Sequence, residues 1–331
     1  MMYTHHLRVR FWNTPAENSM TDSINPQTNH LSVLRDEVVD ILTADRTSED
    51  IVILDCTLGL GGHARAILEK LSPGSTYIGL DTDEQNVIYA RENLKDLGSR
   101  VRFFHANFSQ AREVLEVANL KGVDGILADL GFCSNQMDDP QRGMSFMRPG
   151  PLDMRLDRSQ RKTAADLVNQ TPEKQLADII YQFGEERLSR RIAKAIVNAR
   201  KIARIETTDQ LAEIVAKVMP RPKRVKGKKP IHPATRTFQA IRIAVNEELA
   251  VLDQLLLEIP RLLNPAGRAA VISFHSLEDR PVKRMFADLA RTGYAKLLSK
   301  KPITATEEEI LQNPRARSAK LRAIERLSSL G

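Results

Sequence analysis

The sequence predicts an α/β fold with a mostly parallel sheet, into which an all-helical segment is inserted. Short apolar runs alternate with helical patterns between residues 30 and 130, which is the arrangement of right-handed βαβ units. The alternation then stops, helical patterns follow, and another apolar run stands at 269–274. Because this run resumes the parallel strand order, we interpret the residues before it as an insertion into the sheet domain.

Composition narrows the class of protein. Of the 331 residues, 42% are hydrophobic and 27% charged, which is ordinary for a soluble globular chain. We find no apolar run of the roughly 20 residues that a membrane span needs and no signal-peptide pattern. The two cysteines, Cys56 and Cys133, have no metal-site spacing, and the histidines are scattered. We therefore expect a cytoplasmic protein with reduced thiols and no metal.

The chain is expected to contain three parts. Residues 1–28 are polar and aperiodic, so we predict a disordered leader, and Met20 is an alternative start. The sheet domain is expected to be discontinuous, at 29–132 and 233–331. The inserted helical domain is expected at 133–232, and it ends in a basic, proline-punctuated linker from Pro220 to Pro233.

The elements follow from apolar periodicity and capping residues. The expected strands are 51–55, 76–81, 101–104, 125–130 and 269–274, with an edge strand at 320–325. Helices are expected at 36–42, 63–71 and 83–97, then four in the insertion, the third at 185–204, and a long helix at 234–259. Residues 131–162 are expected to form a loop. A loop of this length is usually functional or disordered.

A glycine-rich turn, Leu54 to Ala64, joins the first strand to a helix, and Asp81 ends the second strand. Such a turn lets the backbone approach a ligand closely, and a carboxylate at Asp81 can accept both hydroxyls of a ribose. The pattern Gly59-x-Gly61-x-x-Ala64 also fits a dinucleotide fingerprint. The acid Asp55 at the strand end suits the cationic amino-acid part of S-adenosylmethionine better than a pyrophosphate. The residues favour S-adenosylmethionine and leave an NAD-dependent oxidoreductase as the alternative.

The carboxyl ends of parallel strands meet at one edge of a sheet, where ligands bind. This rule gathers the following residues at one edge: Asp55, Gly59, Gly61, Gly62, Asp81, Phe108 and Asp129. Phe108 fits either a core position or a cover for an adenine ring.

Positive charge is concentrated in one part of the chain. The net charge is +7, but residues 182–236 hold 15 Lys and Arg against 5 Asp and Glu, a net of +10. A local excess of this kind is typical of a surface that binds nucleic acid. A solvated helix face is the plainer alternative.

Several long stretches identify a family. They are 122–131, 141–155, 232–242, 273–280 and 313–318, together with the glycine-rich turn. Over residues 30–330 the chain closely resembles the RsmH family, also called MraW, the bacterial 16S rRNA cytosine-N4-methyltransferases. That family acts on a decoding-centre cytidine in the P site of the small ribosomal subunit.

The resemblance implies a methyltransferase-type Rossmann-like sheet, S-adenosylmethionine as methyl donor, and an inserted helical domain that recognises 16S rRNA. It also implies these cofactor-binding residues: Gly61, Gly62, His63, Asp81, Phe108, Asp129 and Gln136. This chain departs from the family where Phe132, Cys133 and Asn135 replace Val, Ser and Pro. These changes fall in the loop next to the target base.

The catalytic proton acceptor stays unassigned. Many amino-methylating enzymes carry a Pro-Pro-aromatic motif after the fourth strand, and this chain lacks it. Asp129 is the best carboxylate by position, and Asp153, His232 and Ser273 are weaker candidates. A non-catalytic rRNA-binding assembly factor with a methyltransferase fold is the alternative to an enzyme.

Overall fold

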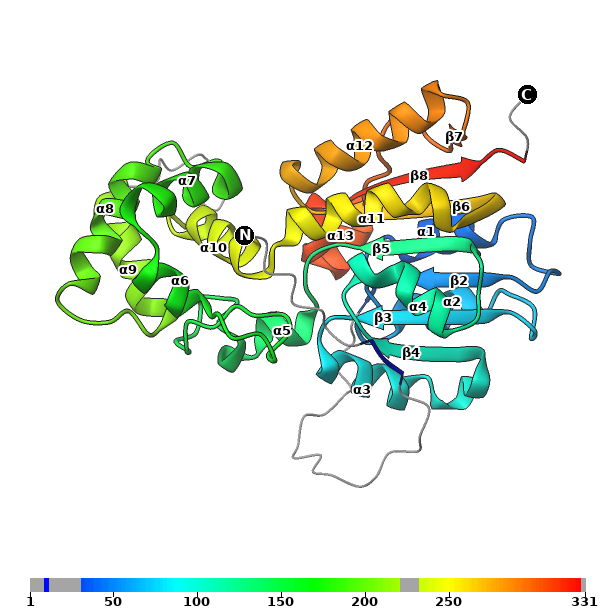
Figure 1. Ribbon diagram of the computed structural model, residues 1–331, viewed down its shortest axis with the longest axis horizontal. Coiled ribbons are helices and arrows are strands. Elements are labelled where there is room, and N and C mark those ends of the chain that lie inside the picture. The colour runs from blue at the N-terminus through cyan, green and yellow to red at the C-terminus, as the bar shows by residue number, and fades with distance from the viewer. Residues whose placement is uncertain (1–8, 12–30, 221–231, 329–331) are drawn as a thin grey trace. The chain divides into compact units, whose positions relative to one another are not determined.

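The computed structural model describes residues 9–11, 31–220 and 232–328. The described chain divides into two compact units (Figure 1). The sheet unit contains the residues up to Gly131 and those from Leu249 onward, and the helical unit is Phe132–Glu248. Most of the expected leader and the linker residues 221–231 lie outside the described residues.

The sheet has eight strands in the order β1-β4-β3-β2-β5-β6-β8-β7. They are β1 (Arg10–Phe11), β2 (Val52–Asp55), β3 (Thr76–Asp81), β4 (Val101–His105), β5 (Val123–Asp129), β6 (Leu263–Ser273), β7 (Ala295–Leu297) and β8 (Lys320–Arg326). The five strands from β4 to β6 are parallel, as expected, and β1, β8 and β7 add antiparallel edges. Strand order reverses direction between β2 and β5, which creates a topological switch point.

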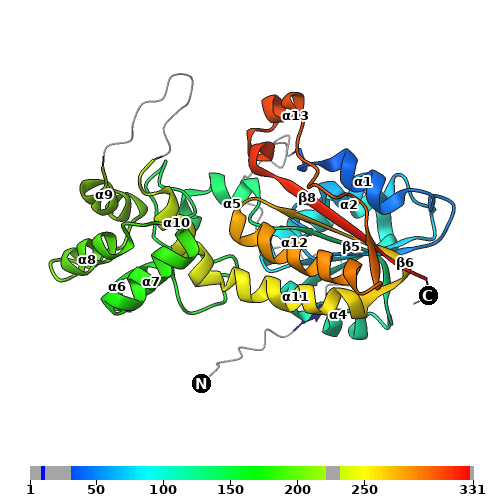
Figure 2. The ribbon, with the colours of Figure 1, turned by 90° about the horizontal axis from the view of Figure 1, so that it is seen from above.

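Helices cover both faces of this sheet (Figure 2). One face packs on α4 (Ala111–Val117), α11 (Glu248–Leu262) and α12 (Ser276–Arg291), and the other on α1 (Arg35–Thr43), α2 (Gly62–Leu68) and α3 (Glu84–Asn93). Leu54, Ile78 and Ile126 face the first layer, and Ile53, Tyr77 and Leu127 face the second. Successive strand residues point to opposite faces, so these near-continuous apolar strands bury both. Within the described chain, no helix is long and apolar enough to span a membrane.

The helical unit has its own apolar core. Its helices are α5 (Ser134–Asp138), α6 (Ala164–Gln170), α7 (Glu173–Gly184), α8 (Ser189–Arg200), α9 (Thr208–Val218) and α10 (Thr235–Asn246). Capping boxes at Thr163 and Thr207 begin α6 and α9, because side-chain oxygens satisfy the first free N–H groups. The core residues of this unit all come from 144–245.

Shorter helical elements occur in both units. They are α13 (Glu307–Gln312) and the 3₁₀ turns η1 (Lys95–Arg100), η2 (Phe108–Gln110), η3 (Pro140–Arg142) and η4 (Pro314–Ser318).

The expected long helix at 234–259 is two helices. Glu247 has φ of 52°, in the left-handed region, and separates α10 from α11. The Asn246 side chain accepts from Leu156 N–H and donates to Met154 O, both at 2.8 Å. These bonds hold the end of α10 against the loop between η3 and α6. The apolar period continues through both helices, so the sequence gives no sign of the break. Consequently α10 packs with the helical unit, and this unit extends beyond residue 232 to Glu248.

The predicted leader contains a strand. Arg10 and Phe11 pair antiparallel with His105 and Phe104 of β4. The Phe11 and Phe104 rings lie 5.0 Å apart. The prediction of disorder over 1–28 was therefore wrong for this short segment. Two residues are too few to produce an alternating pattern, so only the sheet edge that they meet reveals them.

Candidate active site

The carboxyl ends of β2, β3 and β5 bring the predicted acids to one edge of the sheet. Asp55 ends β2, Asp81 ends β3 and Asp129 ends β5. The turn that follows β2 is tied to both neighbouring strands, because Cys56 N–H donates to Leu127 O and Leu58 N–H donates to Leu80 O, each at 2.8 Å. The switch point between β2 and β5 is where ligands of open α/β sheets bind.

Gly61 and Gly62 are required by packing at the start of α2. Gly61 has φ of 84°, and a Cβ there would lie 2.7 Å from a methyl group of Leu94. A Cβ on Gly62 would lie 2.3 Å from the Ser32 hydroxyl. No larger residue fits either position without displacing its neighbours. The backbone at the start of α2 therefore packs closely against Leu94 and Ser32.

Asp81 links the end of β3 to this turn. Its Oδ2 accepts from Gly59 N–H at 2.8 Å and from the Asn86 side chain at 3.3 Å, and its Oδ1 accepts from Asp83 N–H at 2.8 Å. Burial raises the pKa of Asp81 from 3.8 to about 7, and the hydrogen bonds only partly counteract this effect. A carboxylate can accept about four hydrogen bonds, so capacity for a ligand hydroxyl remains.

His63 and Asp129 form the least satisfied part of the edge. His63 Nε2 lies 3.6 Å from Asp129 Oδ2, which is too long for a hydrogen bond. The His63 side chain is 8% exposed, and both of its ring nitrogens and Asp129 Oδ1 are buried without a hydrogen-bond partner among the described residues. Buried polar atoms are almost always paired in native proteins. These atoms therefore mark a place that a polar ligand would complete.

A network of hydroxyl groups holds Asp129 in place. Asp129 N–H donates to Thr57 Oγ1 at 2.7 Å, and Thr57 N–H donates to Asp55 Oδ1 at 2.9 Å. The buried Tyr77 hydroxyl donates to Asp55 Oδ2 at 2.8 Å. Burial raises the pKa of Asp55 from 3.8 to about 6, against the lowering effect of these bonds. Both carboxylate oxygens of Asp55 thus accept hydrogen bonds from protein groups, so Asp55 acts here as a structural support for the edge.

Phe108 follows β4 and begins η2. Asn107 and Gln110 form a capping box around it, with Ser109 N–H donating to Asn107 Oδ1 at 2.9 Å. The Phe108 ring is partly buried and packs against the apolar core beneath α4. It thus contributes to the core from a position just after the carboxyl end of β4.

The model of the MraW methylase family matches residues 27–327. The chain belongs to this family. The resemblance drawn from the motifs is therefore confirmed, and the α/β Rossmann-like methyltransferase fold with its helical insertion is that of a family member.

Two relatives within the family illustrate the extent of the match. Ribosomal RNA small subunit methyltransferase H of Citrifermentans bemidjiense is 46% identical over 314 residues, covering 90% of this chain and 99% of the relative. The protein of the same name from Koribacter versatilis is 48% identical over 307 residues, covering 91% and 95%. The match thus spans both units.

Gln136 lies in the helical unit rather than in the sheet unit. It is buried in α5, and its Oε1 accepts from Cys133 N–H at 2.8 Å in a capping box. The Arg242 guanidinium lies 4.7 Å from the centre of the ring of Phe132, which is near Gln136 in sequence. Glu248 holds Arg242 through hydrogen bonds of 2.8 and 2.9 Å.

The weaker catalytic candidates either already have partners within the protein or lie far in sequence from the residues at the carboxyl edge of the sheet. Burial alone would raise the pKa of Asp153, but hydrogen bonds and charge from Arg155 outweigh it and lower the pKa. Ser273 ends β6, and its hydroxyl donates to Lys320 O at 3.4 Å. His232 lies in the helical unit, where its ring packs on Phe146.

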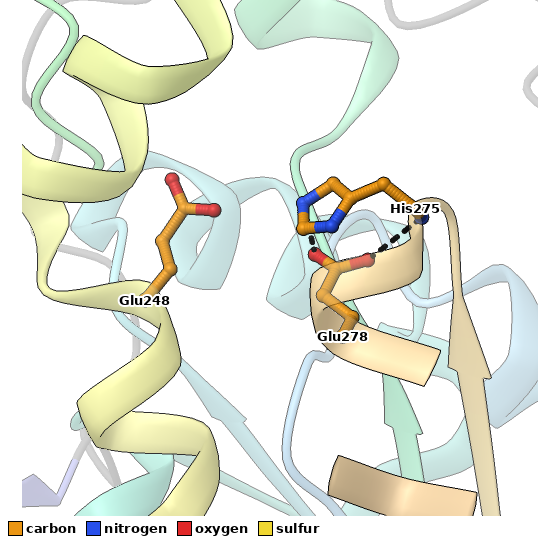
Figure 3. A group of neighbouring side chains, drawn as sticks. All are labelled: Glu248, His275 and Glu278. Atoms are coloured by element: carbon orange, nitrogen blue, oxygen red, sulfur yellow. Dashed lines mark hydrogen bonds and ion pairs between the residues drawn. The ribbon is translucent and has the colours of Figure 1, made fainter. Parts of the chain in front are cut away.

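His275 and Glu278 form a second polar pair in the sheet unit (Figure 3). His275 Nε2 lies 3.2 Å from Glu278 Oε1, while Glu278 Oε2 accepts from Phe274 N–H at 2.8 Å. Glu278 Oε2 also accepts from His275 N–H at 3.3 Å, as part of the capping box that begins α12. The pair therefore has a structural role in starting a helix directly after β6.

Sequence reasoning missed Thr57 and Tyr77. Tyr77 is fully buried within β3, where a hydroxyl needs a partner, and that partner is the acid at the end of β2. A tyrosine inside an apolar strand beside an acid-terminated strand was the available signal. Thr57 gave no signal beyond its place in the turn.

Proposed function

We propose that this protein transfers a methyl group from S-adenosylmethionine to the exocyclic N4 amine of a decoding-centre cytidine in 16S rRNA. Membership of the MraW methylase family supports methyl transfer. Relatives that match 90% of the chain are named ribosomal RNA small subunit methyltransferase H, which supports the rRNA substrate. The identity of the amine rests on the resemblance to the cytosine-N4 enzymes.

The observation that carries the proposal is the unsatisfied pair His63 and Asp129. Both lie at the switch point of a parallel sheet, where a ligand would be expected. The two ring nitrogens of His63 and Oδ1 of Asp129 are buried with no hydrogen-bond partner within the described chain. A structural pair of this burial would be expected to be hydrogen-bonded. A polar ligand that reaches both residues fits the arrangement.

The residues around this pair fit S-adenosylmethionine. Asp81 would accept the ribose hydroxyls, the backbone at Gly61 and Gly62 would approach the amino-acid part, and Phe108 would lie against the adenine. Asp81 already holds the turn through Gly59, which would keep these groups in one arrangement before the cofactor arrives. Gln136 is retained in the proposed set through its match to the family motif.

Asp129 is the proposed acceptor for the N4 proton. When bound, S-adenosylmethionine supplies an electrophilic methyl group on its sulfonium. The cytosine N4 lone pair is delocalised into the ring. A carboxylate that accepts a hydrogen bond from the N4 amine would localise this lone pair on the nitrogen, and it would take up the N4 proton once the methyl group has been transferred. The hydrogen bond from Asp129 N–H to Thr57 would fix the position of that carboxylate.

A basic stripe on the helical unit is the proposed contact for the rRNA backbone. Arg190, Arg191 and Lys194 are exposed on α8, with Arg187 before the helix and Lys201 at its end. The opposite side of α8 is buried and apolar. No ion pair joins these five cations to another residue in the described ranges. The first helical turn disfavours cations, which argues against a purely stabilising role for Arg190 and Arg191.

The other half of the proposed rRNA surface is the basic linker. Its cations are Arg221, Lys223, Arg224, Lys226, Lys228 and Lys229. All six lie outside the described residues. Their place in the proposal rests on the charge of the sequence alone.

Two measurements test the proposal. Calorimetric titration should give binding of S-adenosylmethionine and none of NAD, and the reverse result would favour the oxidoreductase. Tritiated methyl transfer to small-subunit particles, followed by nuclease digestion, should place the label on N4-methylcytidine. Cofactor binding without transfer to the particles or to free 16S rRNA would instead favour a non-catalytic assembly factor.

A further inference from the structure

An aromatic stack stands at the surface of the helical unit. The rings of Phe146 and His232 lie 4.6 Å apart with their planes tilted by 33°. Phe146 also meets Phe238 edge-on, with ring centres 4.8 Å apart. Phe238 is 5% exposed and belongs to the core of the unit. The stack therefore runs from a fixed core residue to the surface.

The outermost ring is held in a defined orientation. His232 Nδ1 accepts from Ala234 N–H at 3.2 Å, at the start of α10. In a neutral imidazole this arrangement places the proton on Nε2. His232 is exposed, while Phe146 is only partly exposed beneath it. One face of the imidazole is thus occupied by Phe146, and the ring still presents surface to solvent.

A surface of this kind fits an unstacked nucleobase. Proteins that recognise single-stranded RNA stack its bases on aromatic or imidazole rings, and a ring that is already ordered adds little entropic cost. The chain also supplies charge for the backbone, because Arg148 and Arg236 are exposed and lie within four residues of Phe146 and His232 respectively. A plain capping histidine would explain the bond to Ala234 but not the stack beneath it.

We propose that His232, supported by Phe146, is a stacking platform for a base of the single-stranded rRNA that flanks the target cytidine. This inference rests on the proposed function, because it takes the substrate to be RNA. It makes His232 an RNA-binding residue and not a catalytic one.

The test separates the ring of His232 from its capping nitrogen. His232→Asn retains a side-chain acceptor for Ala234 N–H but removes the ring, whereas His232→Phe retains a ring but removes the acceptor. Tyr181→Ala is the matched control, since Tyr181 is an aromatic residue of the same unit that is 58% exposed. The probe is a set of short single-stranded RNAs around a cytidine, each with 2-aminopurine at one flanking position, added to the full-length protein.

Base stacking on an aromatic ring should make His232→Asn bind the RNA about 10-fold more weakly, with His232→Phe close to the unchanged protein. Quenching of one 2-aminopurine position should be lost in His232→Asn and present in His232→Phe. Thermal stability should follow the opposite order, and Tyr181→Ala should bind normally. Affinity for S-adenosylmethionine should stay the same throughout.

Equal RNA binding by His232→Asn and the unchanged protein would overturn the platform. So would equally weak binding by His232→Phe and His232→Asn, because a ring at this position would then not be enough to hold the RNA. If the unchanged protein methylates small-subunit particles in either case, only the platform fails. If it neither binds RNA nor transfers a methyl group, the proposed function fails as well.

Discussion

At the residue scale, two buried carboxyl groups connect the sheet to the proposed cofactor site. Asp81 binds the backbone of the glycine-rich turn, and Asp55 binds Tyr77 and Thr57. Burial raises the pKa of both groups, to about 7 for Asp81 and about 6 for Asp55. The structure therefore places two groups with raised pKa values at the proposed cofactor site, so the stability of the fold should depend on pH.

Replacing Asp81 by alanine should weaken S-adenosylmethionine binding by about 10- to 100-fold, because charge-assisted hydrogen bonds contribute about 1.5–3 kcal/mol. Isothermal titration at pH 8 measures this loss. Asp124→Asn is the control, since Asp124 lies at the other end of β5, where it accepts from Val52 N–H at 2.9 Å. Unchanged affinity in Asp81→Ala, or an equal loss in the control, would remove Asp81 from the proposed site.

Asp55 should make stability depend on pH. Its folded-state pKa of about 6 lies above the ordinary value of 3.8. The folded state therefore holds this proton more tightly than the unfolded state, and the resulting stability is complete below pH 4 and lost as pH rises through 6. Between these limits, the unfolding free energy of the unchanged protein should fall relative to that of Asp55→Asn by up to about 3 kcal/mol. Urea unfolding at several pH values measures the difference, and parallel pH curves would contradict it.

The positions of the edge residues could be predicted, but their contacts could not. Asp81 and Asp129 end apolar strands, so the rule for parallel sheets predicted that they share one edge. The bond from Asp129 to Thr57 depends on the path of the turn between β2 and α2 and on one side-chain rotamer. No local pattern encodes either of these.

At the scale of elements, the sequence predicted the parallel strands well because each is a short apolar run. It did not predict β1, which is defined only by pairing with β4. The sequence also predicted α10 and α11 as one helix, because the apolar pattern is continuous and the break lies in the left-handed backbone of Glu247. The sequence thus predicted the strands that a short apolar run defines. It did not predict β1 or the break between α10 and α11, which depend on contacts with residues far away in the chain.

The basic stripe on α8 gives a prediction at this scale. The double variant Arg190→Gln with Lys194→Gln should bind 16S rRNA more weakly, with a log–log salt dependence that is flatter by roughly 0.7–0.9 per lost phosphate contact. Its melting temperature should stay level or rise, because a cation leaves the first turn of a helix.

The matched control is Lys174→Gln with Lys217→Gln, which makes the same change of charge on exposed residues of α7 and α9. Filter binding over a range of salt concentrations compares the two variants. An equal loss in both would show that only the total charge of the unit matters. Normal binding by both variants would indicate that the contacts with the rRNA backbone come from the linker at 221–229 and not from α8.

At the scale of the whole molecule, the two units have separate cores. The core of the helical unit is drawn entirely from residues 144–245, and α10 is part of it. A fragment of residues 132–248 should therefore give a helical circular-dichroism spectrum and a cooperative melt. A fragment that ends at 232, the boundary expected from sequence, should melt without cooperativity because it lacks Phe238 and Ile241. Equal melts would show that α10 is not needed for that core.

The pairing of β5 with β6 has a consequence for the order in which the chain acquires its structure. The two strands are hydrogen-bonded neighbours, yet the entire helical unit lies between them in sequence. On the ribosome, β2 to β5 are synthesised before β6, and the edge of β5 that pairs with β6 stays unpaired while residues 130–262 are made. An unpaired strand edge invites association with other chains. Early folding of the helical unit, whose contacts are more local, would shorten this connection and protect the nascent sheet from aggregation.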